Sequence, residues 1–209
     1  MSNQAVDLYV DPACPWCWLT ATWLYDVETV RPITTTTRLF SLAEVNSDKP
    51  HIAEALMPLV RAERLLVAAR RTGGEGAIRG LYLALGEAHH EEGQALADDA
   101  TLRGALQATG LDSALTHQAM ADDRTLSELL DEHRAVVERG AFGVPTLSVD
   151  GSAPFFGPII DRRITGAEVG ELWDVVAPVL THPRIFELKR ERTGRPGVGR
   201  SRKELVTAR

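Results

Sequence analysis

The sequence is poor in cysteine, with two among 209 residues, and poor in aromatic side chains, which make up 6% of it. Two cysteines can form at most one bridge, so a scaffold held together by several disulfides is excluded. No run of about 18 apolar residues occurs, so no membrane span is predicted. The first apolar run is not preceded by the parts of a signal peptide, which are a positively charged start, an apolar stretch and a cleavage site. This predicts a cytoplasmic protein, in which thiols stay reduced.

Charge is unevenly distributed along the chain, whose formal net charge is −6. Residues 189–209 carry eight Lys or Arg against two Glu, while residues 1–188 carry 15 basic and 27 acidic side chains. An acidic body argues against nucleic acid as the main partner. The basic segment is also rich in Gly and Pro, and this composition predicts a flexible tail over residues 189–209.

Both cysteines belong to one motif, Cys14-Pro15-Trp16-Cys17, which follows the apolar run Val6–Val10 and opens a second apolar stretch. A strand, a CxxC pair and a helix in this order are typical of a thiol–disulfide redox site. At the helix N-cap, unpaired amides and the helix dipole would stabilise a Cys14 thiolate. Pro15 suits the first helical position. Cys17, one turn further in, should be more buried and keep the higher pKa. Cys14 is therefore predicted to attack and Cys17 to resolve the mixed disulfide.

Other uses of a CxxC pair receive less support from the sequence. A closed zinc site needs four ligands, and here there is no second Cys pair, while His89 and His90 are adjacent rather than at ligand spacing. No metal site is predicted. Haem attachment requires a His directly after the second Cys, where Trp18 stands. A buried and inert pair remains an alternative, because free Cys often packs as a small apolar side chain.

The order of predicted elements indicates an α/β fold of the thioredoxin-like class with a large all-helical insertion. Residues 1–45 contain a strand, the helix 14–30 and a second strand at 33–39, which form a βαβ unit with parallel strands. Residues 46–139 have helical periodicity throughout and are predicted to be an inserted helical domain, with helices at 52–71, 77–91, 100–108, 112–121 and 125–139. Residues 140–188 complete the thioredoxin-like domain.

This last part begins with a predicted hairpin and ends with a helix. Asp150-Gly151 is a strong turn signal between a strand at 145–149 and a return strand at 153–156. Thr165 is predicted to cap a final helix that runs to Leu180. In thioredoxin-like proteins, the loop matching Val144-Pro145-Thr146 carries a cis-proline opposite the CxxC. A cis bend there would offer the backbone groups of Val144 and Thr146 to a substrate beside Cys14.

Five segments in this order resemble the DsbA-like family with a helical insertion, and more narrowly its actinobacterial mycothiol-dependent nitroreductases. They are Asp11-Pro12-Ala13-Cys14-Pro15-Trp16-Cys17-Trp18, Phe40-Ser41-Leu42-Ala43-Glu44-Val45-Asn46, Gly143-Val144-Pro145-Thr146, Phe155-Phe156-Gly157-Pro158 and Phe186-Glu187-Leu188-Lys189-Arg190.

The resemblance implies a cytosolic thiol-dependent reductase, which the narrower resemblance makes a nitroreductase, and often a homodimer. It implies no tightly bound cofactor and a low-molecular-weight thiol, mycothiol or similar, as co-substrate. Trp16 would line the substrate cleft, and Asn46 matches a family position near that cleft. A small electrophile or a disulfide is the expected substrate.

Two other functions stay open. Kappa-class glutathione transferases and related isomerases share the architecture but carry a Ser at the position of Cys14. A non-enzymatic redox sensor, whose disulfide moves the helical insertion, is the third hypothesis.

Four further polar residues are interpreted as structural. Asp11 is expected to cap the loop before Cys14, although its charge could also raise the pKa of that thiol. His133 is expected to be a solvated or hydrogen-bonded structural histidine. His89 and His90 are expected at a polar helix end.

Overall fold

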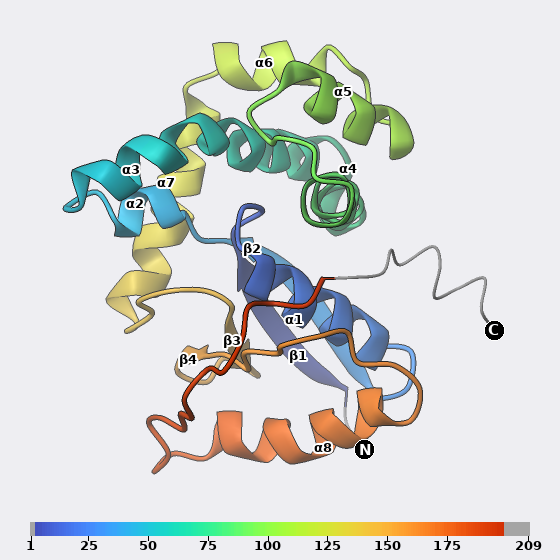
Figure 1. The fold of residues 1–209 in the computed structure, drawn as a ribbon, viewed down its shortest axis with the longest axis vertical. Coiled ribbons are helices and arrows are strands. Elements are labelled where there is room, and N and C mark those ends of the chain that lie inside the picture. Colours follow the sequence, from blue (N-terminus) through green and yellow to red (C-terminus); the bar gives the residue numbers. More distant parts are fainter. Residues whose placement is uncertain (1–2, 199–209) are drawn as a thin grey trace.

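The computed structural model describes residues 3–198 of the chain, in which strands and helices alternate at both ends and helices fill the middle (Figure 1). The elements are β1 (Gln4–Val10), α1 (Pro15–Val27), β2 (Ile33–Leu39), α2 (Leu42–Val45), α3 (Pro50–Leu56), the 3-10 turn η1 (Met57–Leu59), α4 (Val60–Gly86), the π-helical turn η2 (Glu87–Glu91), α5 (Asp99–Ala108), α6 (Leu115–Ala121), α7 (Arg124–Glu138), β3 (Thr146–Val149), β4 (Phe155–Phe156) and α8 (Glu168–Thr181).

A four-stranded sheet in the order β2-β1-β3-β4 forms the centre of the molecule. β1 and β2 are parallel over their full lengths, from Gln4 opposite Ile33 to Val10 opposite Leu39. β3 runs antiparallel to both β1 and β4. The predicted βαβ unit is confirmed, because α1 connects the two parallel strands.

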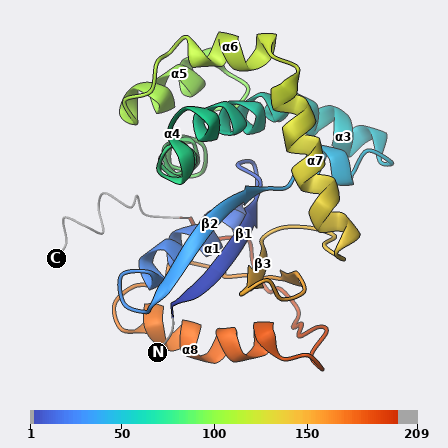
Figure 2. The same cartoon turned by 180° about the vertical axis from the view of Figure 1, so that it is seen from behind.

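Helices cover the sheet and extend beyond one end of it. α1 packs against β1 and β2, with α8 beside it, and Trp23 of α1 meets Trp173 of α8 at a ring-centroid distance of 6.1 Å. Both tryptophans are buried. Figures 1 and 2 show α3 to α7 gathered beyond the end of the sheet at which β1 and β2 finish. No helix within residues 3–198 is long and apolar enough to cross a membrane.

α4 is the longest helix and is bent where the sequence places two glycines. Gly73 and Gly74 leave helical geometry, and Gly74 has φ +64° and ψ −151°, a conformation that glycine adopts most easily. The predicted break between helices 52–71 and 77–91 is therefore confirmed as a kink. The predicted start at residue 52 is wrong, because α3 and η1 precede α4, with Pro58 inside η1.

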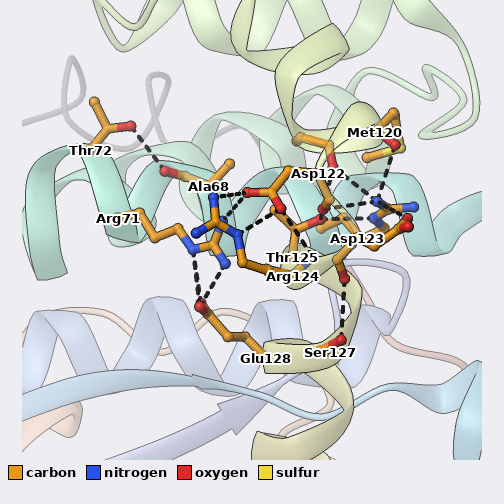
Figure 3. Close-up of polar contacts among 12 residues, drawn as sticks. Ala68, Arg71, Thr72, Met120, Asp122, Asp123, Arg124, Thr125, Ser127 and Glu128 are labelled. Atoms are coloured by element: carbon orange, nitrogen blue, oxygen red, sulfur yellow. Dashed lines mark hydrogen bonds and ion pairs between the residues drawn. The ribbon is translucent and has the colours of Figure 1, made fainter.

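Arginines of α4 join this helix to the start of α7 (Figure 3). Arg71 pairs with both Asp122 and Glu128, at 2.8 and 2.6 Å. Arg64 donates to Thr125 Oγ1 and to the backbone carbonyls of Ala119, Met120 and Asp122 at 2.9–3.2 Å. Carbonyls at the end of α6 thus obtain donors that the helix cannot supply.

Several element ends differ from prediction, although the hairpin turn does not. The Asp150-Gly151 turn is confirmed, with φ of 50° and 75°. The return strand is shorter than predicted, because only Phe155 and Phe156 pair with β3, whereas Pro154 lacks a backbone donor. α8 starts at Glu168 rather than after Thr165, since Gly166 with φ +66° separates that threonine from the helix. α1 also ends earlier than predicted, at Val27.

The domain bounds 1–45, 46–139 and 140–188 stay a prediction, as does the flexibility of residues 189–209. Residues 199–209 of that segment lie outside the described part of the chain. Residues 189–198 are described and have no helix, and they follow an extended path back across the molecule (Figure 1).

Candidate active site at the start of α1

The CxxC motif lies where β1 ends and α1 begins, between the sheet and the helical part (Figure 1). Cys14 is the N-cap residue of α1 and has extended backbone angles, and Pro15 takes the first helical position. These are the positions expected from the sequence. Both cysteines are free thiols, with Cys14 6% exposed and Cys17 fully buried.

Hydrogen bonds converge on the sulfur of Cys14. The backbone N–H of Cys17 donates to Cys14 Sγ at 3.4 Å, as a side-chain cap of the helix. Across the site, Cys14 Sγ lies 3.8 Å from the carbonyl oxygen of Val144, to which the protonated thiol donates. Cys14 is therefore at the meeting point of two segments that are 130 residues apart in the sequence.

The environment separates the pKa values of the two thiols in the expected direction. Hydrogen bonding from the Cys17 thiol is the main cause that lowers the pKa of Cys14, and the backbone N–H groups of Cys17 and Trp16 act in the same sense. Burial raises the pKa of Cys17 well above its ordinary value, and the neighbouring Cys14 raises it further. At a given pH, Cys14 thus carries the larger thiolate fraction and is the better nucleophile of the two.

The loop opposite Cys14 contains the expected cis-proline. The Val144–Pro145 peptide bond is cis, and Pro145 is buried. Thr146 begins β3, where it pairs with Tyr9 and Phe156, and its hydroxyl donates to the Gly143 carbonyl at 2.7 Å. The Pro145 carbonyl accepts from Gly157 N–H at 2.8 Å. A second cis bond, Gly157–Pro158, follows β4 and was not predicted.

Asp11 caps the loop that leads to Cys14, as predicted. Its two carboxylate oxygens accept from the backbone N–H groups of Ala13 and Leu42, at 2.7 and 2.8 Å. Its charge also acts to raise the pKa of Cys14, so both readings of this residue hold.

Glu63 of α4 is a buried partner of Asp11 that sequence reasoning missed. The two carboxyl groups lie close enough to act on each other's pKa, and Glu63 Oε2 accepts from the Ser41 hydroxyl at 3.0 Å, whereas Glu63 Oε1 is buried without a hydrogen-bond donor among residues 3–198. Asp11 is 3% exposed and Glu63 2%. Burial raises the pKa of both carboxyls. Two buried carboxyl groups in contact retain a proton between them, because a shared proton avoids two adjacent buried negative charges.

A second cluster connects Trp18, directly after the motif, to η2. The Trp18 indole N–H donates to Glu91 at 3.1 Å, and Arg163 forms an almost fully buried ion pair with the same carboxylate. His90 stacks on Trp18 and its Nε2 lies 2.9 Å from the Pro12 carbonyl. Because burial lowers the pKa of His90 to about 4, the ring is neutral at pH 7 and donates from Nε2. His89 and His90 lie at a helix end as predicted, and His90 in addition packs on the Trp18 ring.

The remaining predicted residues have structural contacts as follows. Trp16 is partly exposed, and the guanidinium carbon of Arg192 lies 5.3 Å from the centre of its ring. Asn46 ends α2, where its amide donates to the Leu42 carbonyl at 2.9 Å and accepts from Lys49 at 3.1 Å. His133 is buried and accepts from Ser41 N–H at 3.2 Å, which confirms its structural role.

Within residues 3–198, no three His, Cys, Asp or Glu side chains are grouped so that they could hold a metal ion. The arrangement around Cys14 instead suits reversible conversion between two thiols and one disulfide. Cys14 and Cys17 are three residues apart at the start of α1, so both side chains lie on the same side of the helix, and Cys14 has the lower pKa of the two.

Solved structures of thiol oxidoreductases share this architecture. A variant of DsbA from Pseudomonas aeruginosa superposes with a TM-score of 0.58 at 13% identity, covering 86% of each chain. The cytosolic disulfide reductase DsbM from the same organism, solved with GSH, gives a TM-score of 0.51 at 18% identity, covering 68% of this chain and 84% of DsbM. The predicted fold class, thioredoxin-like with a helical insertion, is confirmed.

Sequence relatives narrow this assignment. A Mycobacterium tuberculosis protein described as uncharacterized, Rv2286c, is 32% identical over 194 residues, which are 90% of this chain and 82% of the relative. Residues 13–190 match the family described as Rv2466c-like, mycothiol-dependent nitroreductase Rv2466c. That match includes the CxxC motif, the helical part and the cis-proline loop, and by it the chain belongs to the Rv2466c-like family of DsbA-like thioredoxin-fold proteins.

Proposed function

We propose that the protein is a cytoplasmic thiol–disulfide oxidoreductase that reduces a small electrophile or disulfide, with mycothiol or a similar low-molecular-weight thiol as the electron donor. The observation that carries the proposal is the position of Cys14. Its sulfur caps α1, has a lowered pKa and faces the Val144–Pro145 bond. The family description supports mycothiol, and the GSH-bound DsbM structure supports a thiol co-substrate.

For a disulfide substrate, the first step is attack by the Cys14 thiolate on one sulfur of the substrate. A bond forms between Cys14 and that sulfur, the substrate S–S bond breaks, and the other half leaves as a thiolate. Cys17 then loses its proton and attacks Cys14 Sγ, which releases the second substrate thiol. The two protein thiols are oxidised to a disulfide and the substrate has gained two electrons.

Two molecules of the low-molecular-weight thiol complete the cycle. The first attacks the protein disulfide and forms a mixed disulfide with Cys14, and the second attacks this mixed disulfide. The products are the reduced protein and the oxidised, disulfide form of the donor thiol. Electrons balance, because two donor thiols lose the two electrons that the substrate received.

The proton that Cys17 releases needs an acceptor inside the protein, since Cys17 is fully buried. Asp11 is the carboxyl group whose charge acts on both cysteines. We assign the acceptor role to Asp11 with its partner Glu63, because a pair that holds one proton becomes neutral when it takes up the proton from Cys17.

The substrate is proposed to bind between the motif and the cis-proline loop. Pro15 and Trp16 form one side, and Val144, Pro145 and Thr146 the other. When the substrate enters, the Val144 carbonyl can exchange its contact with Cys14 for a contact with the substrate backbone or amide. Asn46 is proposed to reach the same cleft from the end of α2. The homodimer remains a proposal drawn from the family.

Turnover with mycothiol as the only reductant tests the proposed function. The wild-type protein should accelerate reduction of a small disulfide, and Cys14→Ser should leave only the uncatalysed rate, because serine does not form the mixed disulfide. Full activity of Cys14→Ser would contradict the proposal. Full activity of Cys17→Ser would instead support a thiol transferase of the kappa type, which needs one nucleophile. Absence of turnover in the wild type, together with a large shape change on oxidation, would favour a redox sensor.

A further inference from the structure

The C-terminal segment returns from α8 to the active-site motif. After α8 ends at Thr181, the chain runs past the sheet and in front of α1 (Figure 1). There the guanidinium carbon of Arg192 lies 5.3 Å from the centre of the Trp16 ring, a cation–π distance. Trp16 lies between the two cysteines in the sequence, so this contact places a cation at the motif.

The chain is fixed to the body just beyond Arg192. Gly197 N–H donates to the Asp161 carbonyl at 2.7 Å, and Gly197 forms a parallel bridge with Arg162. A Cβ at Gly197 would lie 3.2 Å from the Asp161 oxygen, so glycine permits this close approach. Val198 then packs against the core. The segment 157–163 is itself joined to α1, where the Thr20 hydroxyl donates to the Pro158 carbonyl at 2.8 Å.

The donors of Arg192 are available to a ligand. Arg192 is exposed, and among residues 3–198 it has neither a carboxylate partner nor a hydrogen-bond acceptor. A guanidinium group presents several N–H donors in one plane, which fits the two oxygens of a carboxylate. Residues 1–188 are acidic overall, so an anion is attracted to the basic segment 189–209, and Arg192 is the cation of this segment that lies at the motif.

We propose that Arg192 is a specificity-determining residue, which binds the carboxylate of an acidic aromatic substrate. The aromatic ring of the substrate then lies beside Trp16, and the electrophilic atom of the substrate reaches Cys14. This inference rests on the proposed function, since it names the substrate class of the same site.

Single-turnover reduction of two aromatic disulfides by the pre-reduced protein tests this assignment. Dithiobis(nitrobenzoate) carries two carboxylates, and dithiodipyridine carries none. Each reacts with Cys14 to a mixed disulfide and one released aryl thiolate, and Cys17 then releases the second. The two protein thiols supply both electrons, so no other reductant is needed, and the released thiolates are followed by absorbance.

Arg192→Gln should lower the second-order rate constant for dithiobis(nitrobenzoate) about tenfold, the effect of one charge-assisted contact. The rate constant for dithiodipyridine should change less than about twofold. Arg192→Lys should recover part of the loss, because it keeps the charge but not the planar donors. Arg195→Gln is the matched control, an exposed arginine of the same segment, and should affect neither probe.

Two outcomes would overturn the inference. An equal fold loss of rate with both probes would show that Arg192 acts only by holding Trp16, and unchanged rates with both probes would show that Arg192 has no role in the site. Failure of the proposed function looks different, because then Cys14→Ser would retain the wild-type rate with both probes.

Discussion

At the scale of single residues, the chemistry of the site depends on which groups are buried next to Cys14. Its pKa is lowered by hydrogen bonds from Cys17 and from backbone N–H groups rather than by a basic side chain. The charge of Asp11 acts in the opposite sense, and this carboxyl lies beside that of Glu63. Loss of the proton that the two carboxyls hold would place more negative charge near Cys14 and would act to raise the pKa of that thiol.

The Asp11–Glu63 pair makes stability depend on pH. Burial raises both pKa values in the folded protein, so the folded state holds a proton that the unfolded chain releases above about pH 4. This contribution to stability is complete below that pH and is lost as the pH rises towards the folded pKa. In Glu63→Gln, the amide N–H can donate to the Asp11 carboxylate, so the pair no longer needs to bind a titrating proton.

We therefore expect the free energy of unfolding of Glu63→Gln, relative to wild type, to rise by about 1–2 kcal/mol between about pH 5 and pH 9. Urea unfolding at a series of pH values measures this difference. Glu54→Gln, at an exposed position of α3, is the control and should show a constant difference. A constant difference for Glu63→Gln as well would mean that the pair holds no extra proton.

At the scale of elements, the sequence predicted those parts whose signals are local. The βαβ unit, the Asp150-Gly151 turn and the cis-proline before β3 follow from short patterns. Element ends were predicted less well, because they depend on contacts with distant residues. α8 begins after Gly166 rather than at the cap pattern of Thr165, and the return strand is limited to Phe155 and Phe156.

The kink in α4 provides a test at this scale with a matched control in the same helix. Gly74 has φ +64°, so Gly74→Ala should lower the free energy of unfolding by about 1–3 kcal/mol. A Cβ at Gly76 would have no neighbouring atom within 4 Å, and Gly76 does not have a positive φ. Gly76→Ala should therefore raise the free energy of unfolding by about 0.5–1 kcal/mol. Thermal or urea unfolding of both variants decides the matter. Equal effects of the two substitutions would contradict a kink that requires glycine.

At the scale of the whole molecule, five separated parts of the chain meet at the candidate active site. Two of them, the CxxC motif and the Val144–Pro145 loop, carry recognisable patterns and were predicted. The other three are Glu63, the η2 cluster around Glu91, and Arg192. These residues stand in ordinary helical or polar sequence, and nothing local marks them, because their importance comes from tertiary contacts with Asp11, Trp18 and Trp16.

The helical part is thereby more than a cover for the sheet. α4 contributes Glu63 to the loop before Cys14, and η2 contributes His90 and Glu91 to the start of α1. The same part is stabilised by the arginine contacts between α4 and the start of α7. Changes in the packing of α4 should therefore reach the thiols directly.

The central claim is that Cys14 attacks and Cys17 resolves, and peptide mass spectrometry of the two single variants tests it most directly. Each reduced variant is incubated with glutathione disulfide or mycothiol disulfide and digested without reductant. The account predicts one stable thiol adduct on Cys14 in Cys17→Ser, and no adduct on the fully buried Cys17 in Cys14→Ser over the same time. An adduct on Cys17 at a comparable rate, or none on Cys14, would contradict it.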